Sequence, residues 1–421
     1  MKANDSRPAQ ALQHIKVLDL SRVLAGPWAA QTLGDLGAEV IKVERPGTGD
    51  DTRAWGPPYV ADAEGQPTGE SAYYMCTNRN KQSISVDFTR GEGQEIVRQL
   101  AARCDVLIEN FKTGGLAQYG LDYASLSALN PRLVYCSVTG FGQDGPYAHR
   151  AGYDFLIQGM GGLMSISGHA DGQPGGGPMK VGVALTDILT GLYASTAILA
   201  ALQAREHTGR GQHIDLALLD VGVACLANQS MNYLYGDQLP QRMGNAHPNT
   251  VPYQEFPTED GHMILAVGND GQFARFCQAA GRGEWAEDER FRSNAARLAH
   301  RAELVAMIRR VTLTRSTRAW VQLLEQHAVP CGPINTVREV FEDPQVRARG
   351  MQIAMTHPKA GQVPLVASPI RLSDTPVTYR HAPPQLGQHT LELLERHLGL
   401  SAQQMQAYRD RGVLGCAARN R

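Results

Sequence analysis

One carboxylate in the sequence stands out because of its surroundings. Residues 181–204, VGVALTDILTGLYASTAILAALQA, form a long and mostly apolar stretch in which Asp187 carries the single charge. Burying an unpaired carboxylate costs several kcal/mol, so this residue needs a structural or a chemical reason. Two compatible interpretations follow. Asp187 caps the N-terminus of a helix, or it is a carboxylate nucleophile that the helix N-terminus keeps ionised, with room for a substrate beside the preceding glycine-rich segment.

The elements that must position Asp187 alternate between strand and helix patterns. Strands are predicted over residues 15–20, 39–44, 82–88, 105–111 and 132–142, and helices over residues 28–37, 91–104, 123–131 and 186–205. This alternation predicts an α/β fold with a doubly wound parallel sheet and right-handed crossovers. From about residue 240 the pattern changes to short strands followed by a charged amphipathic helix over residues 286–313, which predicts a separate, smaller α+β domain.

Cations follow several of the predicted strands. Arg22, Arg45, Arg90 and Lys112 each come shortly after a strand ends. Ligands of open α/β sheets bind at the carboxyl ends of the strands, so these cations indicate a phosphorylated ligand. The net charge of the chain is −1, which gives no global electrostatic case for a nucleic acid or an anionic membrane as partner.

Other classes of enzyme are disfavoured by the motifs. A nicotinamide dehydrogenase would place an acid near Glu44, but the first turn, SRVLAGPWAAQTLG, lacks GxGxxG, and Pro27 stands where glycines would let a pyrophosphate approach. Walker A, HExxH and GxSxG patterns are also absent, so the sequence gives no support for P-loop phosphate transfer, zincin chemistry or an elbow serine.

The cysteines and the N-terminal residues bear on compartment. The seven cysteines are odd in number and contain no CxxC or CxxxC pair, which argues against a disulfide framework and a zinc ribbon, and we expect no metal. The first 17 residues contain no apolar signal-like run. We therefore expect a cytoplasmic protein in which the apolar helix over residues 186–205 is a core helix rather than a membrane span.

The motifs, taken in order, resemble family III CoA-transferases of the CaiB/BaiF type. They are LDLSRVLAGP, GAEVIKVERPGTGDDTR, NRNKQSISVD, DVLIENF, NPRLVYCSVTGFGQDGP, AGYD, VGVALTDILTGLYA, TGRGQHIDLALLD and PQLGQHT, between about residues 14 and 413. Through RVLAGPWAAQTLGDLGAEVIKVERPGTGDDTRAWGPPY and AHPNTVPYQEF, the chain is most similar to the branch that transfers CoA from succinyl-CoA to dicarboxylates such as glutarate or hydroxymethylglutarate.

The resemblance implies a covalent mechanism centred on Asp187. Its carboxylate would attack an acyl-CoA thioester to give a mixed anhydride, and the released CoA thiolate would convert this into an aspartyl-CoA thioester. A free carboxylic acid would then accept CoA from it. The expected partners are therefore an acyl-CoA, with succinyl-CoA as donor, and a free carboxylic acid, and no cofactor is expected to stay bound permanently.

The resemblance also assigns binding roles by position. CoA contacts are expected from Leu24, Ala25, Arg45, Asp87, Arg90, Asn110, Phe111, Lys112, Gln118, Tyr153 and Asp154. Gln118 stands where relatives often carry a further arginine, so the phosphates depend more on the other cations. A distal substrate carboxylate needs a cation, for which Arg22 is the first candidate, followed by Arg53 and His247. The loop with Gly244 and Asn245 is expected to close over the substrate.

The family's architecture implies an interlocked homodimer. A large Rossmann-like domain would comprise residues 1–205 and 376–421, and a small domain residues 241–328. Two linkers, residues 206–240 and 329–375, would join them, and the active site would lie where the two chains meet.

Alternatives remain at this stage. An α-methylacyl-CoA racemase of the same fold uses a histidine in a GHD motif, but the matching motif here is Gly152-Tyr153-Asp154, and a tyrosine with an ordinary pKa near 10 is a poor base at neutral pH. A non-catalytic CoA-binding protein would not need Asp187 in its apolar setting. The dehydrogenase is the third alternative.

Overall fold

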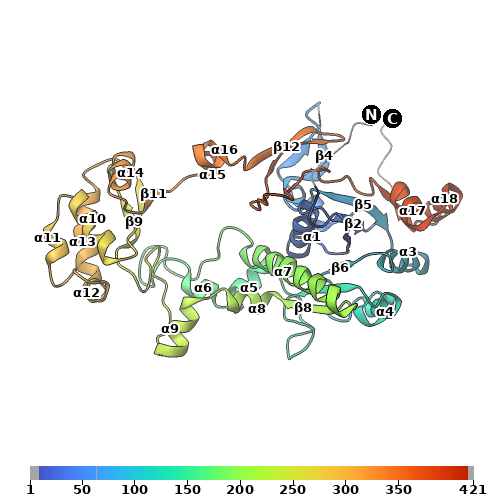
Figure 1. The fold of residues 1–421 in the computed structure, drawn as a ribbon, viewed down its shortest axis with the longest axis horizontal. Helices are drawn as coiled ribbons and strands as arrows, with labels where there is room; N and C mark the ends of the chain where they lie inside the picture. The colour runs from blue at the N-terminus through green and yellow to red at the C-terminus, as the bar shows by residue number, and fades with distance from the viewer. Residues whose placement is uncertain (1–8, 63, 416–421) are drawn as a thin grey trace. The chain divides into compact units, whose positions relative to one another are not determined.

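The computed structural model describes residues 9–62 and 64–415 of the chain (Figure 1). Their contacts divide them into two compact units. The first unit draws on residues within 1–163, 181–231 and 347–421, and the second on residues 164–180 and 232–346. The first unit thus contains residues from both ends of the chain. The domain and linker boundaries expected from the sequence stay predictions.

A seven-stranded sheet forms the centre of the first unit, in the order β14-β5-β2-β1-β6-β7-β8. The strands are β1 Lys16–Asp19, β2 Glu39–Glu44, β5 Lys81–Val86, β6 Val106–Glu109, β7 Val134–Thr139, β8 His213–Ala217 and β14 Leu414–Gly415. All pair in parallel except β14, which runs antiparallel to β5. The predicted α/β class with a mostly parallel sheet is confirmed, and the strand order reverses beside β1, where such sheets bind ligands.

Helices cover both faces of this sheet because its buried strands alternate apolar side chains between two cores. One core packs the sheet against α3 Gly91–Ala101, α4 Tyr123–Leu129, α17 Thr390–Leu398 and α18 Ala402–Asp410. The other packs it against α1 Ala25–Asp35 and α7 Leu185–Thr208. Figure 1 shows α1 and α7 side by side on this face.

Gly191 explains how closely α7 approaches α1. A Cβ atom at this position would lie 2.7 Å from the Ala25 carbonyl oxygen and 2.9 Å from the Trp28 Cβ, so a larger residue would separate the two helices. Asp187 lies four residues earlier on the same face of α7. The close contact therefore brings Asp187 to the loop between β1 and α1.

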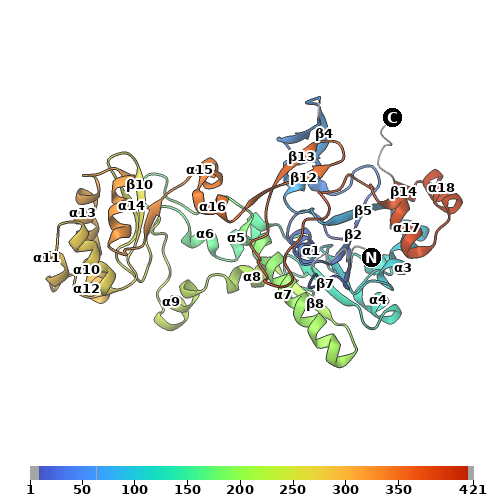
Figure 2. The same cartoon turned by 45° about the horizontal axis from the view of Figure 1, so that its top comes forward.

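Shorter elements complete the first unit. They are β3 Tyr59–Ala61, β4 Pro67–Ser71, α2 Ala72–Met75, α5 Asp154–Met160, α8 Leu218–Ala224, β12 Gln352–His357 and β13 Gly361–Val366, with 3₁₀ turns over Asp51–Ala54 and Ala117–Tyr119. The helix α9 Asn228–Gly236 begins in the first unit and ends in the second. The β12–β13 hairpin packs beside the β3–β4 hairpin (Figure 2) through Met355, Val363 and Leu365 against Met75 and Val60. The helices α6 Leu163–Ile166, α15 Val337–Glu342 and α16 Pro344–Ala348 lie at or near the boundaries between units.

The second unit has its own sheet and core. Its antiparallel strands β9 Tyr253–Pro257, β10 His262–Ala266 and β11 Cys331–Pro333 pair in the order β11-β10-β9. Its helices are α10 Asp270–Ala279, α11 Glu284–Glu287, α12 Asn294–Ala299, α13 Arg301–Thr312 and α14 Thr317–Gln326. Together they enclose an apolar core that includes Phe256, Phe273 and Trp320.

The prediction of one helix over residues 286–313 is wrong, because α11, α12 and α13 divide that range. Ser293 caps α12 by accepting from the Ala296 N–H at 3.3 Å. The buried Arg297 donates to the carbonyl oxygens of Val251 and Phe291 at 2.6 and 2.8 Å. These tertiary bonds need a turn before α12, and they override the continuous amphipathic pattern.

The long apolar helix is α7. It is the only helix of the described residues whose length and apolar composition match a membrane span, and 44% of that stretch is buried within the protein. Its buried residues, including Ala194, Ile198 and Ala201, face the core that contains β7 and α1. One face of α7 is thus a core face, while Leu192 and Tyr193 are exposed on another.

Two fully buried lysines hold the loop that follows β1. Lys81 Nζ donates to Asp19 Oδ2 and to the Pro27 carbonyl, both at 2.9 Å. Lys42 Nζ donates to the Ser21 carbonyl at 2.9 Å and pairs with Asp50 Oδ2 at 2.9 Å. Burial alone would raise the pKa of Asp19, but the ammonium groups of Lys81 and Lys42 outweigh it and lower this pKa. The ionised carboxylate therefore stabilises the fold above its ordinary titration range.

Replacing Asp19 by asparagine should destabilise the protein by about 3 to 5 kcal/mol, because it leaves Lys81 as a buried cation without its carboxylate. Urea denaturation at neutral pH measures this loss. Glu92→Gln is the matched control, since it removes an exposed pair with Arg411 and should cost less than about 1 kcal/mol. If both variants lose equally little, the buried pair does not stabilise the fold.

Candidate active site

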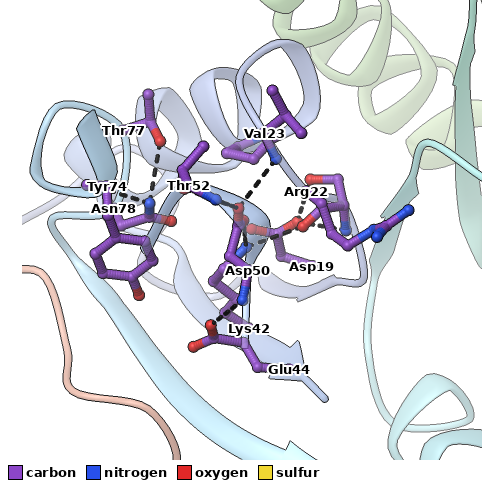
Figure 3. Close-up of polar contacts among 12 residues, drawn as sticks. Asp19, Arg22, Val23, Lys42, Glu44, Asp50, Thr52, Tyr74, Thr77 and Asn78 are labelled. Atoms are coloured by element: carbon purple, nitrogen blue, oxygen red, sulfur yellow. Dashed lines mark hydrogen bonds and ion pairs between the residues drawn. The ribbon is translucent and has the colours of Figure 1, made fainter. Parts of the chain in front are cut away.

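The loop between β1 and α1 is held in an uncommon conformation. Val23 has a φ of 70°, in the left-handed region that β-branched residues rarely adopt. Asp50 Oδ1 accepts from the Val23 N–H at 3.3 Å, as Figure 3 shows. Asn110 fixes the preceding residue twice, because its Oδ1 accepts from the Arg22 N–H at 2.8 Å and its Nδ2 donates to the Arg22 carbonyl at 2.7 Å. The loop is therefore rigidly presented at the carboxyl edge of the sheet.

Two adjoining cavities lie at this edge. The first cavity, of about 500 Å³, is lined by residues that follow β1, β2, β5 and β6. The second cavity, of about 480 Å³, is lined by the β1–α1 loop, the end of β7, residues 150–153 and Asp187. Arg22, Asp51, Phe111 and Lys112 line both cavities, so the two are neighbours.

The first cavity has the chemistry of a nucleotide site. Arg45 and Lys112 are exposed cations in its wall, and neither pairs with a carboxylate among the described residues. Three aromatic rings, Phe88, Phe111 and Tyr119, lie beside them, with the ring of Phe88 5.7 Å from each of the other two. Free cations next to aromatic surface suit phosphates joined to a base.

Asp187 lines the second cavity as the third residue of α7. It is not the N-cap, so that interpretation is wrong: Ala184 occupies the cap position without a side-chain bond. The carboxylate of Asp154 takes the capping role instead, because its Oδ1 accepts from the N–H groups of Thr186 and Asp187 at 2.8 and 3.3 Å. In the described structure no hydrogen bond reaches the Asp187 carboxylate itself, which leaves it free to meet a ligand.

The environment of Asp187 disfavours its charge. Burial, and then the nearby carboxylate of Asp154, raise the pKa of Asp187 to about 7. We expected the helix N-terminus to keep Asp187 ionised. This expectation is wrong in part, because burial and Asp154 raise the Asp187 pKa to about 7 and so leave the residue only partly ionised at neutral pH. At neutral pH the carboxylate titrates, and its ionised form is a poorly solvated and more reactive nucleophile.

Two glycines set the position of Asp154. A Cβ atom on Gly140 would lie 2.5 Å from the Gly152 Cα, and one on Gly152 would lie 2.3 Å from the Gly140 Cα. The backbone after β7 therefore touches the backbone of residues 151–152, which only glycines permit. This contact fixes Tyr153 in the wall of the second cavity and Asp154 at the start of α5, within reach of α7.

The structure brings most of the predicted site residues together. Arg22, Arg45, Asp87, Phe111, Lys112 and Gln118 line the first cavity. Arg22, Leu24, Ala25, Asn110, Phe111, Lys112, Tyr153 and Asp187 line the second. Asp154 lies behind Asp187 as the helix cap. Their roles as binding or catalytic groups stay predictions.

Several predicted residues lie elsewhere. Arg90 is exposed outside both cavity walls, where its guanidinium donates to Asp87 Oδ2 and the Arg411 carbonyl, each at 3.1 Å. Arg53 is buried, pairing with Glu44 at 2.7 Å and also with Glu70. These buried partners remove Arg53 as a candidate for the substrate carboxylate.

The remaining candidates belong to the second unit. Gly244 has a φ of 61°, Asn245 Nδ2 donates to Glu255 Oε2 at 3.4 Å, and the His247 ring lies 5.2 Å from that of Tyr253. These three residues lie within one loop before β9, and their role toward the substrate stays a prediction.

Sequence reasoning missed some residues of the second cavity. Trp55 and Arg150 line it, and neither was a candidate. The signal for Arg150 was its place directly before the AGYD motif, in the sequence HRAGYD. Asp154 was expected as a ligand contact, and its capping bonds to α7 could not be seen from the sequence.

Comparison with known proteins decides the family. The family model described as CoA-transferase family III matches residues 12–390. The chain belongs to this family. Among curated relatives, it is similar to succinate–glutarate CoA-transferase of Agrobacterium fabrum, with 54% identity over 91% of this chain and 94% of the relative. It is 43% identical to human succinyl-CoA:glutarate CoA-transferase over 94% of this chain and 88% of the relative.

The solved structures agree with the fold of this CoA-transferase. A CaiB/BaiF family protein from Brucella suis is similar with a TM-score of 0.81 and 51% identity, over 93% of this chain and 100% of that one. Rv3272 of Mycobacterium tuberculosis is similar with a TM-score of 0.79 and 30% identity, over 91% and 99%. The resemblance inferred from the motifs is thereby confirmed.

Asp154→Asn should shift the pH dependence of CoA transfer. The asparagine oxygen can still accept from the N–H groups of α7, but the negative charge that helps to raise the Asp187 pKa is gone. If Asp187 is the nucleophile, as its unpaired carboxylate in this cavity leads us to expect, it must be ionised for transfer, and kcat/KM of the wild type should fall as pH drops below about 7. In the variant this fall should begin at lower pH. An unchanged acidic limb in a folded variant would exclude electrostatic coupling between the two carboxylates.

Proposed function

We propose that this family III CoA-transferase moves CoA from succinyl-CoA to a free dicarboxylate, glutarate or hydroxymethylglutarate, through covalent intermediates on Asp187. The proposal is based on the half-buried carboxylate of Asp187, which has no hydrogen-bond partner among the described residues. Asp187 lines the second cavity, and the first cavity beside it is lined by cations. The names of the relatives, which transfer CoA between succinate and glutarate, support the choice of substrates.

In the first half-reaction, the ionised Asp187 carboxylate attacks the thioester carbonyl of succinyl-CoA. The C–S bond breaks, the CoA thiolate leaves, and a mixed anhydride of Asp187 and succinate forms. The thiolate then attacks the aspartyl carbonyl. Succinate departs, and an aspartyl-CoA thioester remains.

The second half-reaction runs the same steps in reverse with the acceptor. A glutarate carboxylate attacks the aspartyl thioester, which releases the thiolate and forms a glutaryl anhydride. The thiolate attacks the glutaryl carbonyl, so that glutaryl-CoA leaves and the Asp187 carboxylate is free again. A thioester is exchanged for a thioester, and for this reason no ATP is consumed.

The polarity of the site suits these intermediates. Both the anhydride and the aspartyl thioester are neutral at Asp187, while the resting carboxylate is charged. Burial and the charge of Asp154 disfavour only the charged form, as the pKa of about 7 indicates. The surroundings therefore favour covalent attachment relative to the free carboxylate.

The substrate can be placed by its charges. CoA carries three phosphates, for which Arg45 and Lys112 are the unpaired cations of the first cavity, and its adenine has the aromatic rings there. The thioester then extends into the second cavity, where Tyr153 and Asp187 are. Backbone N–H groups would stabilise the oxyanions. CoA is a substrate in this scheme, and no permanently bound cofactor is needed.

We further propose that the protein is a cytoplasmic homodimer with interlocked chains. Large apolar side chains of the first unit are exposed on α5, α7, α8 and α9, namely Phe155, Leu156, Met160, Leu192, Tyr193, Leu199, Val223 and Met231. An apolar surface of this kind favours a partner, and a second copy of the chain is the one that the family resemblance implies. The six described cysteines are all free, which fits a reducing compartment.

Asp187→Ala should abolish transfer. With succinyl-CoA and a panel of free acids, mass spectrometry should detect glutaryl-CoA or hydroxymethylglutaryl-CoA from the wild type, and about 10³-fold less or none from the variant. Asp410→Ala is the matched control, because Asp410 is an exposed carboxylate of α18 and lines neither cavity. Wild-type protein should also gain the mass of CoA less one water during turnover, because the thioester sulfur replaces a carboxyl oxygen of Asp187.

The same assay separates the alternatives. Lack of transfer to every acid, together with α-proton exchange on a methylacyl-CoA, would replace the proposal by a racemase. Binding of acyl-CoA with neither reaction would indicate a non-catalytic CoA-binding protein.

A further inference from the structure

Arg150 lies in the wall of the second cavity and has no carboxylate partner among the described residues. It shares this wall with Asp187 and Tyr153, and it does not line the first cavity. Its guanidinium lies 4.6 Å from the centre of the Tyr147 ring and 5.0 Å from that of Phe141, and its Nη2 contacts Met160 Sδ at 3.8 Å. These neighbours hold the side chain in place without neutralising its charge.

The other cations that line the two cavities either pair with a carboxylate or also line the first cavity. Arg22 pairs with Asp51 at 2.9 Å. Lys112 lines both cavities, while Arg45 and the paired Lys42 line only the first. Of the described residues that form the two walls, Arg150 is the only cation confined to the cavity that contains Asp187. A positive charge here faces the acyl end of the substrate rather than its phosphates.

The position of Arg150 is built into the backbone. The contact between Gly140 and Gly152 fixes the backbone directly after Arg150 and before Asp154, so one backbone contact restrains the positions from which both side chains extend. Two aromatic rings from residues 141 and 147 then limit its rotamers. An arginine restrained in this way loses little further entropy when it binds a carboxylate through two parallel N–H groups.

We infer that Arg150 binds the distal carboxylate of the acyl group and thereby makes the enzyme selective for dicarboxylates. The inference rests on the proposed function, because it takes the thioester carbonyl to lie at Asp187. Succinyl and glutaryl groups each place a second carboxylate beyond that carbonyl. Asp154 and Asp187 would repel this anion, so a site for it needs a cation within the second cavity.

The test compares two acceptors that differ only at the distal end. Glutarate and pentanoate have the same chain length, but pentanoate ends in a methyl group. In a ping-pong reaction, kcat/KM for the acceptor reports only on steps after the enzyme-CoA thioester has formed, so the ratio of the two values does not depend on the donor. Arg150→Met should lower the glutarate-to-pentanoate ratio about 10- to 100-fold, the effect of losing charged hydrogen bonds.

Two further variants sharpen the comparison. Arg150→Lys keeps the charge but loses the planar pair of donors, so it should retain part of the selectivity. Arg103→Met removes an exposed arginine whose Nη1 donates to the Gln99 carbonyl at 3.1 Å and which lines neither cavity, and it should leave the ratio unchanged. Circular dichroism and thermal melting confirm that all variants are folded.

The outcomes are distinct. A fall for glutarate alone supports the inference. An unchanged ratio, or equal falls for both acceptors, overturns it, the latter because Arg150 would then act on the reacting groups or on CoA. If the wild type transfers CoA to no acid, the proposed function fails by itself. Thermal stabilisation by glutarate but not pentanoate, lost in Arg150→Met, would then still support a carboxylate site at Arg150, and no such difference would reject it.

Discussion

The Asp154 carboxylate at the start of α7 is the contact on which the active site depends. By accepting from the N–H groups of Thr186 and Asp187, it satisfies the helix N-terminus that Asp187 would otherwise be drawn to cap. Among the residues that the structure describes, the Asp187 carboxylate is thereby left without a hydrogen-bond partner. The same carboxylate, second to burial, raises the Asp187 pKa to about 7. One side chain thus helps to set both the position and the pKa of the proposed nucleophile.

Buried charged residues also hold another part of the wall of the second cavity, the loop after β1. The loop after β1 contains a valine at positive φ, a conformation that costs energy unless its neighbours fix it. Asp50 holds the Val23 N–H, and Lys42, itself fully buried, pairs with Asp50 and donates to the Ser21 carbonyl. Such pairs give little net stability compared with apolar packing. Their value here is geometric, since they keep the loop open beside Asp187.

How much the sequence predicts depends on the range of the interaction concerned. The strand at 39–44 is found at those residues, and the expected cations Arg45 and Lys112 meet in one cavity, because strand pattern and sheet topology place strand ends together. The helix over 286–313 failed because Arg297 makes tertiary bonds that no local pattern contains. The prediction that Arg53 binds the substrate carboxylate also failed because of tertiary contacts. Arg53 pairs with Glu44 and Glu70, and the sequence pattern does not show that these three residues form a buried cluster. Arg150 was missed because only the fold places it in the wall of the cavity that Asp187 lines.

The division of charge between the two cavities suggests why this site suits acyl exchange. Where the phosphates are expected, Arg45 and Lys112 are exposed, so we expect binding there to give affinity with modest specificity. The second cavity adds Arg150, which lines only this cavity, and Asp187, which has Asp154 behind it. The Asp187 carboxylate is partly buried, so charges near it interact more strongly. The surroundings of Asp187 disfavour its charged form, which lowers the stability of the folded protein at neutral pH. Enzymes often lose stability in this way where a group must be reactive. If Asp187 is acylated as we propose, this penalty disappears, so burial and the charge of Asp154 favour the covalent intermediate over the resting carboxylate.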